Sequence, residues 1–81
     1  AAPNPARNSV TFYYDIESDA AIYVYDVAGR LVYSADLAAG TNAHEWNLIT
    51  GDKPIAAGLY FYAVVTVDGA RSEVGRLVIE R

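Results

Sequence analysis

The sequence contains no cysteine and no methionine, and it has a single tryptophan, a single histidine and a single lysine. Without cysteine, disulfides, thiolate metal sites and cysteine nucleophiles are excluded. Small domains often rely on such staples, because a thin core stabilises weakly. The chain has 81 residues, of which 53% are hydrophobic, so packing alone must hold the fold together.

Positive charge is also scarce, with six basic residues against ten acidic ones and a net charge of −4. Nucleic-acid binding needs clustered cations that replace counterions, and here the basic residues are scattered, so no nucleic-acid partner is expected. No apolar run approaches the roughly 18–20 residues that cross a bilayer, and the N-terminus has no signal-peptide pattern. The opening "AAPNPARN" predicts that residues 1–8 are a linker leading into a domain of a longer protein.

What the chain does have is a set of residues typical of β-sheets, including seven Tyr and two Phe among many Val and Ile. Residues 9–16 alternate, with Val10 and Phe12 on one face and Thr11 and Tyr13 on the other, which predicts a half-buried strand. Similar patterns predict further strands at 21–26, 30–37, 43–48, 58–67 and 72–81. No segment has the apolar spacing of a helix, so residues 1–81 are expected to form a single small antiparallel β-sandwich.

Residues 59–65 are apolar at nearly every position, which predicts a strand covered on both faces. Tyr60 and Tyr62 share one face of this strand and are expected to be buried with hydrogen-bonded hydroxyls. Asp68-Gly69 predicts a hairpin turn after it. Trp46 is expected at the centre of the core.

The segment "IYVYDVAGRLVYS", residues 22–34, is interpreted as two strands joined by a tight turn. Gly29 is expected to adopt the backbone conformation that other residues resist. Asp26 is expected to accept hydrogen bonds from backbone N–H groups of the turn, which makes it a structural residue rather than an acid catalyst.

Catalytic patterns are missing. No nucleophile-elbow sequence surrounds any serine, and His44 has no evident base-and-orienter partners. The acidic stretch "DIESD" at 15–19 lacks the spacing and the glycine of an EF-hand, so it is interpreted as a solvated turn. Lys53 lies in a polar loop, where the burial needed for an isopeptide bond is not expected. The sequence therefore predicts no catalytic residue, no cofactor and no metal site.

Five pieces of the chain, taken in order, carry a family resemblance: "PNPARNSVTF", "IYVYDVAGRLV", the tryptophan of "HEWN", "GDKPIAAGLYFY" and "GRLVIER". Together they resemble FlgD-like immunoglobulin domains and the related C-terminal sorting domains of the type IX secretion system, over Pro3 to Arg81. One departure is the loop between Trp46 and Gly58, which is one residue shorter than the commonest form and has "GDKP" where a second glycine often follows the Asp.

The resemblance implies an all-β, immunoglobulin-like antiparallel β-sandwich of about seven strands, without catalytic residues. It also implies the C-terminal domain of a larger bacterial protein that passes through the periplasm and is secreted or held at the cell surface. The secretion machinery would then be the partner, and the last strand the sorting signal. The residues expected to be recognised are Gly75, Arg76, Leu77, Val78, Ile79, Glu80 and Arg81.

A second hypothesis is a structural accessory module. If Ile22 and Val24 face the core, Tyr23 and Tyr25 face outward. Exposed rings could dock on a neighbouring domain of the parent protein or contact glycans, whereas cross-strand pairing within the sheet would give them a purely structural role. The residues considered for this docking face are Tyr13, Tyr23, Tyr25 and Tyr33. An apolar last strand at a sheet edge could also pair between copies of the chain.

Overall fold

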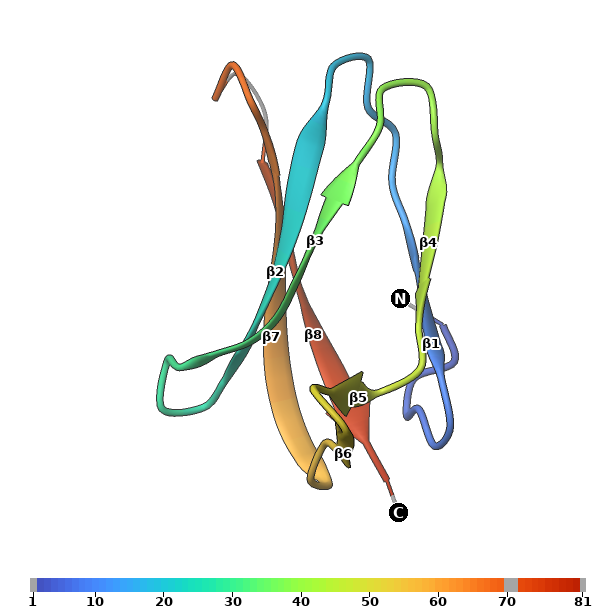
Figure 1. Ribbon diagram of the computed structural model, residues 1–81, viewed down its shortest axis with the longest axis vertical. Coiled ribbons are helices and arrows are strands. Elements are labelled where there is room, and N and C mark those ends of the chain that lie inside the picture. The colour runs from blue at the N-terminus through green and yellow to red at the C-terminus, as the bar shows by residue number, and fades with distance from the viewer. Residues whose placement is uncertain (1, 70–71, 81) are drawn as a thin grey trace.

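The computed structural model describes residues 2–69 and 72–80, and within them all regular structure is β-strand (Figure 1). The strands are β1 (Val10–Tyr13), β2 (Ala20–Asp26), β3 (Leu31–Leu37), β4 (Ala43–Trp46), β5 (Ile49–Thr50), β6 (Lys53–Pro54), β7 (Gly58–Thr66) and β8 (Ser72–Ile79). The expected all-β antiparallel fold is confirmed. The strands not foreseen are β5 and β6, a pair of two-residue strands within a segment that the sequence predicted to be a loop.

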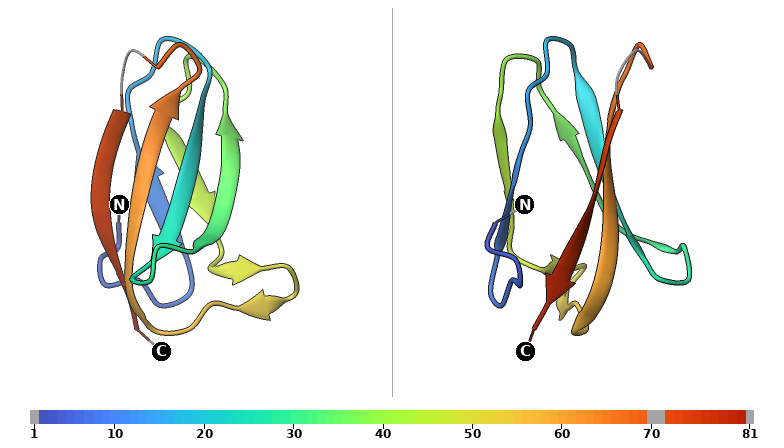
Figure 2. Two further views of the ribbon diagram at one scale, coloured as in Figure 1. Left: turned by 90° about the vertical axis from the view of Figure 1, so that its left-hand side faces the viewer. Right: turned by 180° about the vertical axis from the view of Figure 1, so that it is seen from behind.

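Two layers form the domain. A four-stranded antiparallel sheet in the order β3-β2-β7-β8 packs its inner face against the pair β1-β4, as both views of Figure 2 show. The β5-β6 hairpin lies at one end, between β4 and β7 in the chain. This arrangement makes β3 and β8 the edge strands of the larger sheet, because each has only one neighbour in it.

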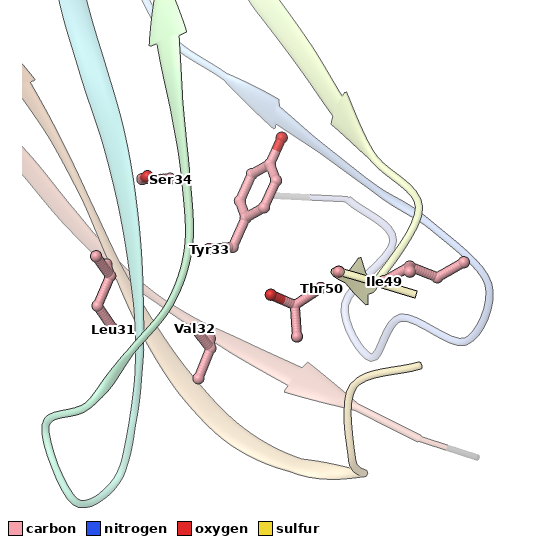
Figure 3. Close-up of a pocket in the computed structure, with 7 residues that line it drawn as sticks. Leu31, Val32, Tyr33, Ser34, Ile49 and Thr50 are labelled. Atoms are coloured by element: carbon pink, nitrogen blue, oxygen red, sulfur yellow. The ribbon is translucent and has the colours of Figure 1, made fainter. Parts of the chain in front are cut away.

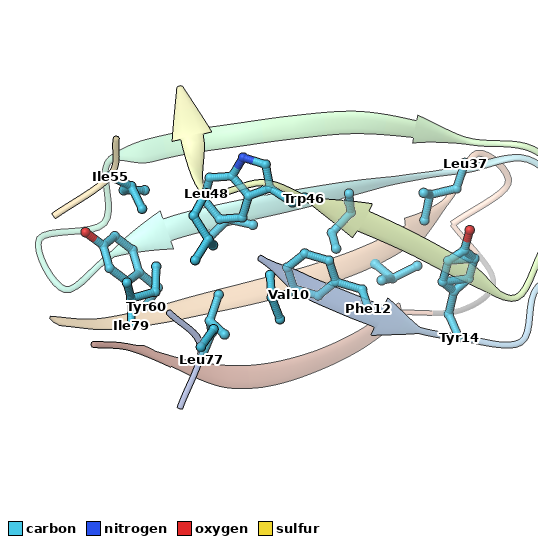
Figure 4. Packing of buried hydrophobic residues seen from close by; sticks show 14 of the residues in the cluster. Val10, Phe12, Tyr14, Leu37, Trp46, Leu48, Ile55, Tyr60, Leu77 and Ile79 are labelled. Carbon is cyan, nitrogen blue, oxygen red and sulfur yellow. The ribbon is translucent and has the colours of Figure 1, made fainter. Parts of the chain in front are cut away.

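The core lies between the layers and follows the alternation of the strands (Figure 4). Ile22 and Val24 of β2 are fully buried, as the alternation of that strand predicted. Trp46 is 2% exposed, and its indole N–H donates to the carbonyl of Ile49 at 3.0 Å, so its expected core position is confirmed. Tyr60 is also buried, with its hydroxyl donating to the carbonyl of Ala56 at 2.7 Å.

The expectation that β7 is covered on both faces is wrong. Tyr60 and Val64 face the core, but Leu59 and Phe61 face the other way and are each 37% exposed. The β1-β4 layer covers only one face of the larger sheet, and within the described residues no strand packs on the other face. The apolar character of 59–65 therefore reflects a core face and an exposed apolar face.

The turn between β2 and β3 has the expected structure. Gly29 has a φ of 85°, in the left-handed region that glycine favours. Oδ1 of Asp26 accepts hydrogen bonds from the backbone N–H of Ala28 at 3.0 Å and from that of Arg30 at 2.9 Å. The Asp26 carboxylate therefore closes the turn, as predicted. The hairpin predicted at Asp68-Gly69 is confirmed as well, since β7 and β8 pair antiparallel around it.

The segment expected to be a linker is part of the domain where the structure describes it. Ala2 pairs with Thr11 of β1 through two backbone hydrogen bonds, of 2.9 and 2.8 Å. Ala6 is fully buried and forms a parallel bridge with Ile79 of β8. The start of the chain therefore contacts the strand at its far end.

Candidate functional site

The segment expected to be recognised is the second half of β8, at the edge of the four-stranded sheet. Figure 2 shows β8 as the outermost strand beside β7. The register runs from Gly58 opposite Ile79 to Val65 opposite Ser72, so β7 holds one edge of β8 along its whole length. Only the other edge of β8 is available for contacts outside this sheet.

The inward-facing residues of β8 serve packing. Leu77 is fully buried and Ile79 is 2% exposed, and both belong to the core cluster (Figure 4). Gly75 also faces inward, where a Cβ atom would lie 2.7 Å from Cε1 of Tyr62. These three residues hold β8 on the core, and in the folded domain their side chains are not a surface that a partner can read.

The outward-facing residues of β8 are accessible. Arg76 and Glu80 are exposed, and Val78 is 39% exposed. Arg81, the last of the expected recognition residues, lies outside the described part of the chain. A row of a cation, an aliphatic side chain and an anion thus follows the edge of the sheet.

The free edge of β8 is closed by Asn4. Its side-chain Nδ2 donates to the carbonyl of Arg76 at 3.3 Å, and its Oδ1 accepts from the backbone N–H of Val78 at 3.0 Å. The primary amide thus offers β8 one donor and one acceptor, as the peptide group of a neighbouring strand would.

The main chain of Ala6 continues this closure. Its N–H donates to the carbonyl of Val78 at 2.8 Å, and its carbonyl accepts from the N–H of Glu80, also at 2.8 Å. Arg7 and Glu80 form an exposed ion pair at 3.3 Å. Sequence reasoning missed this contact between the two ends of the chain, although the "PNPARN" and "GRLVIER" motifs that form it had both been singled out.

The four tyrosines considered as a docking face do not form a single surface. Tyr23 and Tyr25 share the outer face of the larger sheet and are half-buried, with Tyr25 opposite Phe61 in the register. Tyr13 lies in β1, in the other layer, and is 64% exposed. Tyr33 faces inward from β3, against Trp46. Grouping Tyr13 and Tyr33 with Tyr23 and Tyr25 was wrong, because the strands that carry them face different directions.

Tyr33 joins the two layers near the open edge of β3. Its ring stacks on Trp46 with 4.3 Å between centroids and 13° between planes. Its hydroxyl lies 2.6 Å from Nε2 of His44. Partial burial raises the pKa of Tyr33 above its ordinary value. His44 is therefore a structural partner of Tyr33 rather than a general base beside a serine.

A shallow hollow of about 350 Å³ lies between β3 and the β5-β6 hairpin (Figure 3). Its lining consists of Leu31, Val32, Tyr33, Ser34, Ile49, Thr50 and Gly51. Tyr33 is the only titratable group among these residues, so the lining offers no pair of groups for acid–base catalysis.

The outer face of the larger sheet is rich in apolar side chains. The large hydrophobic residues exposed on its strands, here called the outer apolar face, are Leu31, Leu59, Phe61, Val74 and Val78. Tyr23 and Tyr25 lie among them. Exposed apolar patches on this scale are typical of surfaces that contact another protein or domain.

Within residues 2–69 and 72–80, no three His, Asp or Glu residues are grouped as a metal site would require. The same residues include no helix long and apolar enough to cross a membrane.

Comparison with known proteins gives two matches. Residues 2–80 match the family described as "Secretion system C-terminal sorting domain". The fold is similar to part of PorZ, an essential bacterial surface component of the type IX secretion system of Porphyromonas gingivalis, with a TM-score of 0.77 and 27% sequence identity. That match covers 99% of this chain and 11% of the PorZ chain, so the chain spans only a small part of the length of PorZ. Among curated proteins, a search gave no match.

Proposed function

The chain belongs to the family of secretion system C-terminal sorting domains, and from that premise we propose that the outward row of β8 is what the secretion machinery reads. The domain itself is a non-catalytic, immunoglobulin-like sorting domain of the type IX secretion system. As such it interacts with the secretion machinery, and proteins that carry it are secreted or attached at the cell surface.

The observation that carries the proposal is the division of β8 into two faces. Leu77 and Ile79 are committed to the core, which fixes the position and direction of the strand. Arg76, Val78 and Glu80 are thereby presented in a row along a sheet edge. A sorting signal built in this way is read from a folded, rigid strand, and recognition pays little conformational entropy because the side chains are already in place.

The chemistry of the row favours a partner with a matching pattern. A cation and an anion flank one aliphatic side chain, so a complementary surface would offer an acidic group, an apolar contact and a basic group in that order. Arg76 can bind a carboxylate through two parallel hydrogen bonds, which a lysine cannot do. Such a surface would fix both the register and the direction of the strand.

Deleting residues 75–81 would be an ambiguous test, because it also removes Leu77 and Ile79 from the core. A sharper test replaces Arg76, Val78 and Glu80 with alanine in the full-length parent protein and follows its delivery to the cell surface. We expect the parent protein to remain in the periplasm. A matched control replaces Leu31, Ser34 and Asp36 of the opposite edge strand, and this variant should be delivered normally.

Both purified variants should first be shown to unfold at the same urea concentration as the wild-type domain. If the folded β8 variant is delivered as efficiently as the wild type, the outward row is not the recognised element. If the control variant fails equally, the machinery reads the whole folded domain rather than its last strand.

The outer apolar face supports an additional, structural role. Tyr23, Tyr25 and Phe61 form an aromatic group on a sheet face that no described strand covers. A neighbouring domain of the parent protein would bury this group. The test is to replace Tyr23 and Tyr25 with serine in the parent. A docking role predicts a lower melting temperature of the parent, whereas an unchanged melting temperature would exclude the contact.

A further inference from the structure

The edge of β8 is an unusual one, because its hydrogen-bonding groups are satisfied by the start of the same chain. Between Arg76 and Glu80, the carbonyls of Arg76 and Val78 and the N–H groups of Val78 and Glu80 each have a partner in Asn4 or Ala6. The N-terminal segment thus occupies the place of a further strand, parallel to β8 at the Ala6–Ile79 bridge. An edge closed in this way cannot pair with another chain.

This closure is weakly anchored. Ala6 is the only residue between Ala2 and Asn8 whose side chain is buried, and an alanine side chain buries little apolar area. Asn4 and Arg7 are exposed, and the Arg7–Glu80 ion pair is exposed at both ends. Exposed ion pairs contribute little, and regions with few buried contacts open at a lower free energy than the rest of a domain.

The segment also stays tethered when these contacts break. On one side, Ala2 is bonded to Thr11 of β1 by two hydrogen bonds. On the other side, the chain continues through Asn8 and Ser9 into β1. Residues 4–7 can therefore lift off β8 as a loop between two fixed points, and they return to the same place because both ends are held.

We propose that residues 4–7 are a reversible latch, here called the NPAR latch, which closes the recognition edge of β8 and opens without unfolding the sandwich. When the latch is open, the backbone of β8 from Arg76 to Glu80 can accept an extended segment of another polypeptide by strand addition. Such a segment must run parallel to β8 to satisfy the groups that Ala6 satisfies in the closed state.

The role of the latch in export rests on the proposed recognition of β8, but its existence does not. Hydrogen exchange of the folded 81-residue chain measures it directly, without any secretion machinery. A latch that fails this measurement leaves recognition of the outward row standing. Conversely, normal export of the Arg76/Val78/Glu80 variant would leave the latch standing.

The experiment compares the wild type with Asn4→Ala by amide exchange followed by NMR. In the wild type, we expect the amides of Val78 and Glu80 to exchange faster than those of Ile22 and Val64 in the central strands. In Asn4→Ala, the exchange of Val78 and Glu80 should accelerate by about tenfold, because two hydrogen bonds are lost, while the central amides remain unchanged. Asn8→Ala, in the same segment, is the matched control and should leave all four rates unchanged.

A second variant refines the test. Asn4→Asp keeps the acceptor for the N–H of Val78 but loses the donor to the carbonyl of Arg76, so its effect should be smaller than that of Asn4→Ala. If Val78 and Glu80 exchange in Asn4→Ala as they do in the wild type, Asn4 does not close the edge and the proposal is wrong. If the central amides accelerate by the same factor, the segment is an integral part of the sandwich rather than a latch, which also overturns the proposal.

Discussion

Gly75 of β8 and Tyr62 of β7 are partners in the register, and the tyrosine ring occupies the space that a side chain at Gly75 would need. A Cβ atom on Gly75 would lie 2.7 Å from Cε1 of Tyr62. Tyr62 in turn packs edge-on against Phe12 of the other layer, with 4.9 Å between ring centroids. The glycine therefore lets an aromatic ring lie across the last strand and contact the facing layer.

Gly75→Ala should lower the free energy of unfolding by about 1–3 kcal/mol, the usual cost of forcing an extra methyl group into a packed site. Urea denaturation followed by tryptophan fluorescence measures this change. On a Tyr62→Ala background the same substitution should cost much less, because the ring no longer occupies the space. An equal cost on both backgrounds would show that Gly75 is needed for its backbone and not for Tyr62.

The two faces of β8 should respond differently to truncation. Leu77→Ala should lower the free energy of unfolding by about 2–5 kcal/mol, because it leaves a cavity in the core. Val78→Ala, one residue further along, should change it by about 0.5 kcal/mol or less, since Val78 faces outward. Comparable losses in thermal or urea unfolding would contradict the separation of packing from recognition on this strand.

The bond between Tyr33 and His44 should contribute measurably to stability. Tyr33→Phe keeps the stack on Trp46 but removes the hydroxyl, and should lower the free energy of unfolding by about 0.5–1.5 kcal/mol. A double-mutant cycle with His44→Ala isolates this bond. Tyr33→Phe should cost nearly nothing when His44 is already absent, and an undiminished cost would assign the effect to another contact of the hydroxyl.

Gly29→Val should lower the free energy of unfolding by about 1–2 kcal/mol, because a φ of 85° forces the new Cβ towards the backbone. Gly29→Asn is the matched control and should cost less, since asparagine tolerates the left-handed region. No Cβ contact closer than 4 Å would arise at this position, so the cost is conformational and not steric packing. Equal stability of the valine variant and the wild type would contradict the left-handed turn.

The turn should also give a pH dependence. The pKa of Asp26 lies below its ordinary value, chiefly because the backbone N–H of Arg30 donates to the carboxylate, which together with the other bonds of the turn outweighs desolvation. The folded state therefore binds this proton less tightly than the unfolded state. The stability from Asp26 is present above the unfolded pKa of about 3.9 and is lost as the pH falls through the lower, folded value.

NMR titration of the side-chain carboxyl carbon of Asp26 measures the shift directly. In urea unfolding, the difference between the wild type and Asp26→Asn should shrink as the pH falls below about 4. A difference that stays constant over this range, or an Asp26 pKa at its ordinary value, would contradict the bonding described for the turn.

Much of the fold could be predicted from local patterns. Alternation in β2 placed Ile22 and Val24 in the core, and the Asp26 turn followed from the chemistry of aspartate and glycine. These features depend on residues close together in the chain, so the sequence contains them directly. The all-β sandwich and the family of sorting domains could be recognised for the same reason, because ordered local motifs carry both.

The orientation of Tyr33 and the exposure of Phe61 could not be predicted. Both depend on which faces of the larger sheet the β1-β4 layer covers, and an apolar residue on a strand has the same pattern whether its face is buried or open. The group of four tyrosines was wrong for this reason.

The sequence by itself determined the strands, the turns and the family, because each is a local property of neighbouring residues. Only the tertiary structure showed that Asn4 and Ala6 close the edge of Arg76 to Glu80. The residues that meet there are more than seventy positions apart, as are Asn4 and Val78 with a separation of 74. A contact of that kind is made by the packing of the two layers, which brings together chain segments whose own patterns contain no mark of each other.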